Sequence, residues 1–359
     1  MRSLIIGYGV TGRSFERFLL DKNQEFDIFD EKFSSHVEQN KNTRKFSNVN
    51  DIKKYKKIFI SPGIKISKYF SRKELEEIEL ISDLDLFFME NKSFKIGVTG
   101  TNGKSTFVAF LNQYLSKISS SIALGNIGTP LLDNIKHDKK YSVIEVSSFQ
   151  LEKMSENYFD LSVITNIQID HLDFHENFEN YKRSKMRICA DEKTTFFLTD
   201  SSYEESVKKI ANHIEPDHDI LDINFQNLPY RLQKIRTGFI NDSKSTNSYS
   251  LKHAIFRESF NGILLMCGDP KKEKYNELII EGPTKILIFG KHRNELKKLI
   301  KHHDIEVLLN LQESFERLKV IKHNHDVLFS PGNPSGEDFN NYIERGKAFN
   351  NFVEEYFEK

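Results

Sequence analysis

The pattern with the clearest chemistry in this 359-residue chain is a glycine-containing segment that ends in lysine, serine and threonine. It reads Gly100-Thr-Asn-Gly-Lys-Ser-Thr106 and follows the strand-like run Lys95–Val98. Glycines let backbone N–H groups converge on a phosphate at a helix N-terminus, while lysine adds a positive charge and serine a hydroxyl for Mg²⁺. The common motif G-x-x-x-x-G-K-[ST] needs glycine where this chain has Val98, so a variant phosphate loop is predicted. The alternative is an ordinary glycine turn between a strand and a helix.

Acidic and histidine side chains follow two further apolar runs. Glu145 lies at the end of one such run, and Asp170-His171-Leu-Asp173 comes shortly after another. Ligands of open α/β sheets bind at the carboxyl ends of the strands, so these side chains are expected near the same phosphates. A carboxylate and a neutral imidazole suit Mg²⁺ there, although Mg²⁺ prefers oxygen. The structural alternatives are a surface carboxylate for Glu145 and a hydrogen-bonded loop histidine for His171.

A second glycine pattern lies at the N-terminus. Gly7-Tyr-Gly-Val-Thr-Gly12 follows the first apolar run, and Asp30 ends the second. This spacing resembles the G-x-G-x-x-G turn with which Rossmann domains hold dinucleotides. An NAD-dependent oxidoreductase is therefore an alternative function. It leaves Lys104 and His171 without a role, and a single motif of this kind is weak support.

Short apolar runs alternate with amphipathic segments along the chain, which predicts an α/β fold with mostly parallel sheets. The expected strands are Leu4–Ile6, Phe26–Phe29, Ile58–Ile60, Lys95–Val98, Tyr141–Val146, Leu161–Thr165, Thr195–Leu198, Gly238–Ile240, Ile263–Met266, Ile286–Phe289, Glu306–Leu309 and Val327–Phe329. A closing helix is expected from about Glu337 to Phe357. Looser patterning near Asn91–Ser93 and Asn227–Pro229 divides the chain into three predicted domains, residues 1–91, 92–228 and 229–359.

Composition excludes several classes of function. Basic and acidic residues number 52 each, so no general attraction to nucleic acid or an anionic membrane is expected. No apolar stretch approaches the roughly 20 residues that a membrane span needs. The two cysteines, Cys189 and Cys267, are too few for a disulfide framework. Because no signal-peptide pattern opens the chain, we expect a cytoplasmic protein that acts on small molecules.

In order along the chain, these motifs resemble those of the Mur ligase family, and folylpolyglutamate synthases share the form of the phosphate loop. The resemblance continues through Asn241-Asp-Ser-Lys-Ser-Thr-Asn247 and Ser330-Pro-Gly-Asn-Pro-Ser335, and it is strongest to the members that add D-glutamate. It implies an N-terminal Rossmann-like UDP-binding domain, a shortened central P-loop ATPase-type domain and a C-terminal Rossmann-like domain. The implied reaction is ATP-dependent ligation of D-glutamate to UDP-N-acetylmuramoyl-L-alanine through an acyl phosphate, in peptidoglycan precursor synthesis. A monomer that uses ATP and two Mg²⁺ ions is expected.

The resemblance also implies roles for individual residues. Lys104, Lys185 and His171 would be catalytic, and Lys185 falls where these ligases carry a carbamylated lysine; the alternative for Lys185 is a solvated lysine in a basic helix. ATP would be bound by Gly100, Thr101, Asn102, Gly103, Lys104, Ser105, Thr106, Arg231 and Asp242. The UDP substrate would be bound by Val10, Thr11, Asp30, Glu31, Lys32, Ser61, Gly63, Asn126 and Ser147. The amino acid would be bound by Thr246, Lys271, Ser335 and Tyr342. The Mg²⁺ ions would be held by Ser105, Glu145, His171 and Lys185.

Some positions depart from the family pattern. Between Ser201 and Leu228 the chain lacks the Gly-x-His-Asn-x-x-Asn motif that helps to hold adenine in most members. Tyr230, Gly336 and Tyr342 replace the usual histidine, leucine and phenylalanine. A ligase for another amino acid is therefore an alternative, although the Asp-Asn-Pro-Arg motif of the diamino-acid-adding ligases is absent. A non-catalytic nucleotide-binding relative is a further alternative.

Overall fold

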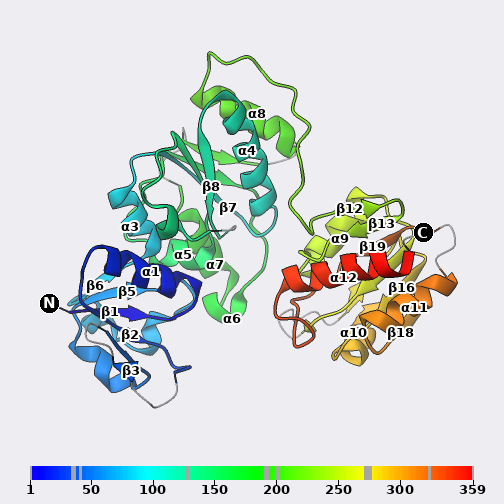
Figure 1. The fold of residues 1–359 in the computed structure, drawn as a ribbon, viewed down its shortest axis with the longest axis horizontal. Helices are drawn as coiled ribbons and strands as arrows, with labels where there is room; N and C mark the ends of the chain where they lie inside the picture. Colours follow the sequence, from blue (N-terminus) through cyan, green and yellow to red (C-terminus); the bar gives the residue numbers. More distant parts are fainter. Residues whose placement is uncertain are drawn as a thin grey trace. The chain divides into compact units, whose positions relative to one another are not determined.

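The computed structural model describes the chain apart from residues 1, 34–37, 40–42, 127–128, 190–193, 199–201, 271–276, 322–324 and 358–359. It consists of two compact units, Met1–Phe225 and Gln226–Lys359, which are described in turn. Figure 1 labels their helices and strands. None of the helices in the described part of the chain has the length and apolarity that a membrane span requires.

The first sheet of the first unit has the strand order β3-β4-β2-β1-β5-β6. Its strands are β1 (Ser3–Ile6), β2 (Phe26–Phe29), β3 (Glu38–Gln39), β4 (Arg44–Phe46), β5 (Lys57–Ile60) and β6 (Glu79–Ile81). All pair in parallel except β3 with β4. The connecting segments contain α1 (Val10–Asp21), η1 (Val49–Lys54), η2 (Ile66–Lys68), α2 (Arg72–Leu75) and α3 (Asp83–Glu90).

The second sheet of this unit is entirely parallel, in the order β11-β10-β7-β9-β8. Its strands are β7 (Phe94–Thr99), β8 (Ser121–Gly125), β9 (Tyr141–Glu145), β10 (Leu161–Ile164) and β11 (Thr195–Phe197). The helices around it are α4 (Lys104–Ile118), η3 (Leu131–Asn134), α5 (Ser148–Lys153), α6 (Leu172–His175), α7 (Phe178–Met186) and α8 (Tyr203–Ile214). In Figure 1, α4 and α8 lie beside each other on this sheet.

One apolar core joins the two sheets of the first unit. Because successive strand residues point to opposite faces, Val143 of β9 packs under α4 and α8, whereas Ile144 faces the other way. Ile144 shares its core with Ile5 of β1 and Phe87 of α3, all essentially inaccessible to solvent. Burying apolar surface from both sheets in one core explains why residues 1–225 form a single unit. A separate domain that ends near residue 91 stays a prediction.

The second unit has a sheet in the order β12-β13-β19-β14-β16-β18, parallel except for β12. The strands are β12 (Gln233–Arg236), β13 (Phe239–Asn241), β14 (Ile263–Met266), β16 (Lys285–Ile288), β18 (Ile305–Val307) and β19 (Val327–Phe329), with β15 (Leu278–Ile279) and β17 (Ile300–Lys301) paired separately. The helices are α9 (Ser248–Arg257), α10 (Arg293–Leu299), α11 (Leu311–Ile321) and α12 (Tyr342–Phe357). Alternating strand residues again serve two cores, one with α9 and α10 and one with α11 and α12.

The predicted α/β class is confirmed, and each expected strand matches an observed strand within about two residues. The expected start of the closing helix at Glu337 is wrong, since α12 begins at Tyr342. The Asn341 side chain accepts hydrogen bonds from the N–H groups of Ile343 and Glu344, so it caps the helix there.

Candidate functional site

The glycine segment forms a tight loop between β7 and α4. Gly103 precedes the helix with φ 83°, a left-handed conformation that favours glycine. Gly100 has φ 153°, and a side chain there would meet the Thr165 hydroxyl. The N–H groups of Thr101 and Asn102 donate to the main-chain and side-chain oxygens of Asn166, at 2.8 and 3.0 Å. The loop after β10 therefore holds the loop after β7. Ser105 and Thr106 lie in the first turn of α4.

Two lysine side-chain nitrogens converge on one carbonyl oxygen of this loop. Lys104 donates to Gly100 O and Thr101 O, both at 2.8 Å. Lys185, from α7, donates to the same Gly100 oxygen at 2.7 Å. The two nitrogens are therefore close neighbours, and the positive charge of Lys104 favours binding of an anion beside them.

Lys185 is almost completely buried, with 2% of its surface exposed. Burial lowers its pKa well below the usual range, and the neighbouring Lys104 lowers it further, while Asp170 and Glu145 act in the opposite direction. A buried lysine of this kind holds a neutral amine far more readily than a solvated one. The alternative of a solvated helix lysine is therefore wrong.

Glu145 ends β9 and is buried, with 2% exposure. Its Oε1 accepts a hydrogen bond from the Asn126 side chain at 3.1 Å. Its Oε2 has no hydrogen-bond partner among the described residues. The alternative of a surface carboxylate is thus wrong, and one oxygen remains available to a cation.

His171 lies at the start of α6 with a left-handed φ of 52°. Its ring packs edge-on against Phe149, with centroids 4.9 Å apart. Partial burial of the ring lowers the pKa of His171, although 45% of the side chain is exposed; Asp170 opposes this, and Lys104 and Lys185 lower it further. The imidazole is therefore neutral at pH 7, the form that can bind a metal.

The residues predicted to hold Mg²⁺ fit that ion in chemical type. Glu145 supplies an unpaired carboxylate oxygen and Ser105 a hydroxyl, while the depressed pKa of Lys185 reduces the positive charge nearby. No group of three or more His, Cys, Asp and Glu side chains suited to a metal occurs within the described ranges. Mg²⁺ commonly keeps several waters and takes only one or two carboxylates beside substrate phosphates, so a sparse protein ligand set is appropriate.

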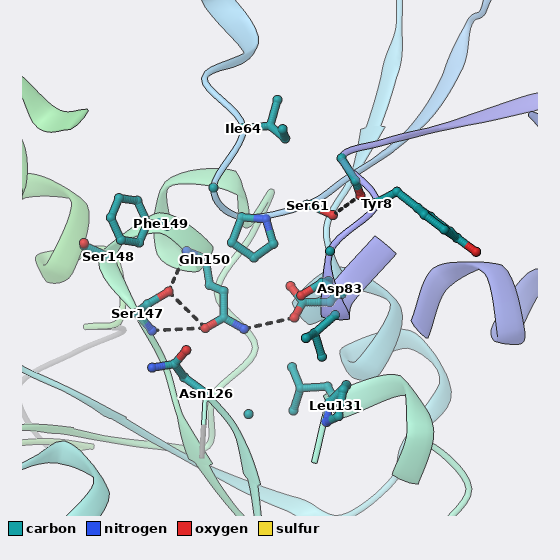
Figure 2. A pocket seen from close by; sticks show the side chains of 18 of the residues that line it. Tyr8, Ser61, Ile64, Asp83, Asn126, Leu131, Ser147, Ser148, Phe149 and Gln150 are labelled. Atoms are coloured by element: carbon teal, nitrogen blue, oxygen red, sulfur yellow. Dashed lines mark hydrogen bonds between the residues drawn. The ribbon is translucent and has the colours of Figure 1, made fainter. Parts of the chain in front are cut away.

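A cavity of about 890 Å³ extends through the first unit from the N-terminal glycine turn to the phosphate loop. Lys104, His171 and Lys185, which are predicted to be catalytic, line the end at the phosphate loop. Every residue predicted to bind the UDP substrate also lines it: Val10, Thr11, Asp30, Glu31, Lys32, Ser61, Gly63, Asn126 and Ser147. Residues from both sheets thus surround one space large enough for a nucleotide-linked ligand, part of which is shown in Figure 2. Their individual roles stay predictions.

The N-terminal end of this cavity is formed by three loops that hydrogen bonds join together. Asp30 accepts main-chain hydrogen bonds from Tyr8 at 2.6 Å and Lys32 at 2.9 Å, which ties the loops after β1 and β2 together. The Ser61 hydroxyl donates to Gly7 O at 2.7 Å and adds the loop after β5. A Cβ at Gly12 would lie 2.0 Å from Gly7 O, so the close approach of α1 requires glycine.

Several cavity residues were not anticipated from the sequence, namely Asp83, Phe149, Gln150 and Tyr181. Gln150 completes a capping box with Ser147 at the start of α5 and also donates to Asp83 at 2.9 Å (Figure 2). Ser147-x-x-Gln150 is a recognisable capping signature, so this pair carried a sequence signal. Asp83 is 67 residues from Gln150, and no local pattern links the two.

In the second unit, the predicted residues gather at the carboxyl ends of adjacent strands β13 and β19. Asp242 is buried, which raises its pKa to about 6, while Arg231 lowers it in part; it accepts from Ser330 Oγ and Leu232 N–H. Thr246 follows in the loop before α9, Ser335 in the loop after β19, and Tyr342 opens α12. Lys271 lies outside the described residues.

A buried arginine ties these two loops together. Arg345 has no exposed surface and donates to Ser243 O, Ser243 Oγ and Asn333 O at 2.7, 3.1 and 2.9 Å. Ser243 lies beside Asp242, and Asn333 lies two residues before Ser335. The guanidinium therefore fixes the relative position of the predicted ATP-binding and amino-acid-binding loops.

Comparison with known proteins extends this description. A family model described as the Mur ligase middle domain matches residues 98–262. The UDP-N-acetylmuramoylalanine--D-glutamate ligase of Francisella tularensis subsp. tularensis (strain WY96-3418) is 31% identical over 415 aligned residues, covering 99% of this chain and 96% of the relative. The alignment is longer than the chain, so the relative has segments that this chain lacks.

Solved structures are similar in fold. A crystal structure of MurF from Acinetobacter baumannii has a TM-score of 0.56 at 12% identity, covering 98% of this chain and 90% of that one. A pseudomurein peptide ligase type C from Methanothermus fervidus has a TM-score of 0.54 at 15% identity, covering 99% of both chains. Fold, phosphate loop and relatives together define an ATP-dependent ligase that forms amide bonds. Within that class, the chain belongs to the Mur ligase family.

Proposed function

We propose that this protein ligates D-glutamate to UDP-N-acetylmuramoyl-L-alanine, with ATP hydrolysed to ADP and phosphate. The main support for this proposal is one continuous cavity that begins at the Gly7–Gly12 turn and ends at Lys104, His171 and Lys185. A ligand whose nucleotide rests on the N-terminal turn can thereby present its far end to the phosphate loop. The similarity to a D-glutamate ligase over 99% of the chain supports the choice of substrates. We expect the enzyme to act as a cytoplasmic monomer.

The chain's own residues bind the substrates, orient the reacting groups and neutralise phosphate charge. The N–H groups at the start of α4 and the Lys104 ammonium hold the outer phosphates of ATP, so that the substrate carboxylate reaches the γ-phosphorus. ADP leaves and an acyl phosphate forms. The amine of D-glutamate then attacks the acyl carbon, loses a proton and expels phosphate. Mg²⁺, when bound through Glu145, Ser105 and His171, neutralises phosphate charge.

We further propose that Lys185 reacts with CO₂ to form a carbamate. The depressed pKa favours the neutral amine, which adds to the carbon of CO₂ and loses a proton, so that an anionic carbamate forms beside the predicted Mg²⁺ site. A ¹³C NMR spectrum in ¹³CO₂-equilibrated buffer should show a carbamate signal that Lys185→Met abolishes. Lys182→Met is the matched control, because Lys182 is an exposed lysine of the same helix. A wild-type spectrum without the signal would contradict this proposal.

The function is tested by ADP release in the presence of UDP-N-acetylmuramoyl-L-alanine and a panel of amino acids. D-glutamate should stimulate release strongly, and L-glutamate, D-aspartate and diaminopimelate should not. Stimulation by another amino acid alone would overturn the assignment of D-glutamate. Binding of NAD in place of the UDP precursor would overturn the ligase assignment and favour an oxidoreductase.

A further inference from the structure

Asp83 is a buried carboxylate that opens onto the substrate cavity. It is the first residue of α3, 4% of its surface is exposed, and it lines the cavity (Figure 2). Its Oδ2 accepts the hydrogen bond from Gln150 Nε2 at 2.9 Å. Its Oδ1 is buried and has no hydrogen bond of normal geometry within the described part of the chain, although the nearby N–H groups of Leu84 and Asp83 lower the pKa of the carboxyl. Unpaired buried acceptors are rare and costly, so this oxygen calls for a ligand.

The nearby Asp85 shows what a purely structural carboxylate looks like on the same helix. Its Oδ2 accepts from the Ser82 N–H and hydroxyl, at 2.9 and 2.8 Å. Its Oδ1 accepts from the Ser155 N–H and hydroxyl at the same two distances. Asp85 is buried to a similar extent, yet both of its oxygens are used by the fold. Of these two carboxylates, only Asp83 has an oxygen without a hydrogen bond of normal geometry, and only Asp83 lines the cavity.

The topology fixes which part of a ligand would reach Asp83. At the carboxyl edge of the first sheet, the loops follow one another in the order β2, β1, β5 and β6. Asp30 follows β2, and Asp83 follows β6 three strands away, a distance of roughly 14 Å at normal strand spacing. On its other side, Asp83 is bonded to Gln150 of α5, which belongs to the sheet that carries Lys104. Asp83 therefore lies between the two ends of the cavity.

An ionised carboxylate at that place accepts hydrogen bonds and repels phosphate. Burial raises the pKa of Asp83 to about 6, a rise that its hydrogen bond to Gln150 partly offsets, so the group is mostly ionised at neutral pH. The portion of the ligand beside it must be uncharged and must carry O–H or N–H donors. The sugar of a nucleotide-linked glycopeptide meets both requirements, whereas its diphosphate meets neither.

This proposal rests on the proposed function: we propose that the Asp83 carboxylate accepts a hydrogen bond from a sugar hydroxyl or amide N–H of the UDP-linked substrate. Asp83→Asn tests this directly. Asparagine can still accept from Gln150, but it places an NH₂ group against the donor of the sugar. Leaving that pair unmatched should weaken binding about tenfold to a hundredfold. Calorimetric titration without ATP should show this loss for UDP-N-acetylmuramoyl-L-alanine, with UDP bound as in the wild type.

Asp85→Asn is the matched control. It should lower the melting temperature and leave the affinity for both ligands within twofold of the wild type, because Asp85 does not line the cavity. Unchanged binding of the full substrate by Asp83→Asn would overturn the proposal. An equal loss for UDP alone would overturn it too, since Asp83 would then act on the nucleotide or on the loops. If the wild type binds neither ligand, the proposed function itself fails.

Discussion

Gly12→Ala is expected to disable the N-terminal turn. A Cβ at this position would lie 2.0 Å from Gly7 O, whereas real Cβ atoms are essentially never within 3.0 Å of such an atom. The oxygen cannot move aside freely, because it accepts the Ser61 hydroxyl at 2.7 Å. Helix α1 must therefore shift away from β1 by about an ångström. Overpacking of this kind costs about 1–3 kcal/mol of folding stability, and a displacement of about 1 Å can lower kcat/KM by about a hundredfold.

Gly9→Ala provides the matched control in the same turn. Gly9 has φ −80°, which any residue adopts, and its Cβ would meet nothing within 4 Å among the described residues. We expect its free energy of unfolding to stay within about 0.5 kcal/mol of the wild type. Urea unfolding of the three proteins, with kcat/KM for the UDP substrate, measures both effects. Equal stability of the Gly9 and Gly12 variants would refute the steric argument.

Three further outcomes are expected. Lys104→Met should lower kcat by about 10²–10³-fold, the usual effect of removing one donor that stabilises charge in the transition state. Lys117→Met, in the last turn of the same helix, should leave kcat unchanged. Equal rates for the two variants in a phosphate-release assay would contradict the catalytic role of Lys104. Glu145→Gln should raise the Mg²⁺ concentration for half-maximal activity at least about tenfold. It should not lower the melting temperature, because glutamine can still accept the hydrogen bond from Asn126 and Oε2 has no partner among the described residues. An unchanged Mg²⁺ titration would exclude Glu145 as a ligand. Burial raises the pKa of Asp83 from 3.8 to about 6, so folding favours its protonated form and that stabilisation is lost as pH rises through 6. The free energy of unfolding, compared with that of Asp83→Asn, should fall by about 2 kcal/mol between pH 4 and pH 7, as urea titrations at each pH would show. A flat difference would contradict the pKa.

The sequence predicts central strands better than edge strands. β1 and β14 are buried along their whole length, and all of their residues except Ser3 are apolar, because helices or a second layer cover both faces. Apolar runs of that kind are conspicuous in a sequence. The sequence does not predict β8, because it is an edge strand whose residues are mostly half-buried. It also contains Ala123 and Gly125, residue types that are uncommon in strands. The start of α12 depends on one capping side chain, which apolar periodicity does not reveal.

The residues of the candidate site also differ in how well the sequence predicts them. The phosphate loop and the N-terminal turn are local patterns, so glycine spacing alone predicts them. Lys185 is different, because its charged neighbours Lys182 and Arg183 indicate a solvated helix, yet the chain buries it against a carbonyl 85 residues away. Only the tertiary fold shows that contact. Asp83 likewise has no local signal, since its role depends on Gln150 and on the order of strands in the sheet.

Oxygen transfer tests the central claim, activation of the substrate carboxylate by ATP. UDP-N-acetylmuramoyl-L-alanine carrying ¹⁸O in both carboxylate oxygens would be incubated with ATP, Mg²⁺ and D-glutamate, and the released phosphate analysed by mass spectrometry. Formation of an acyl phosphate predicts one ¹⁸O atom in each phosphate and one in each amide product. Phosphate released without ¹⁸O, while amide is formed, would contradict the account.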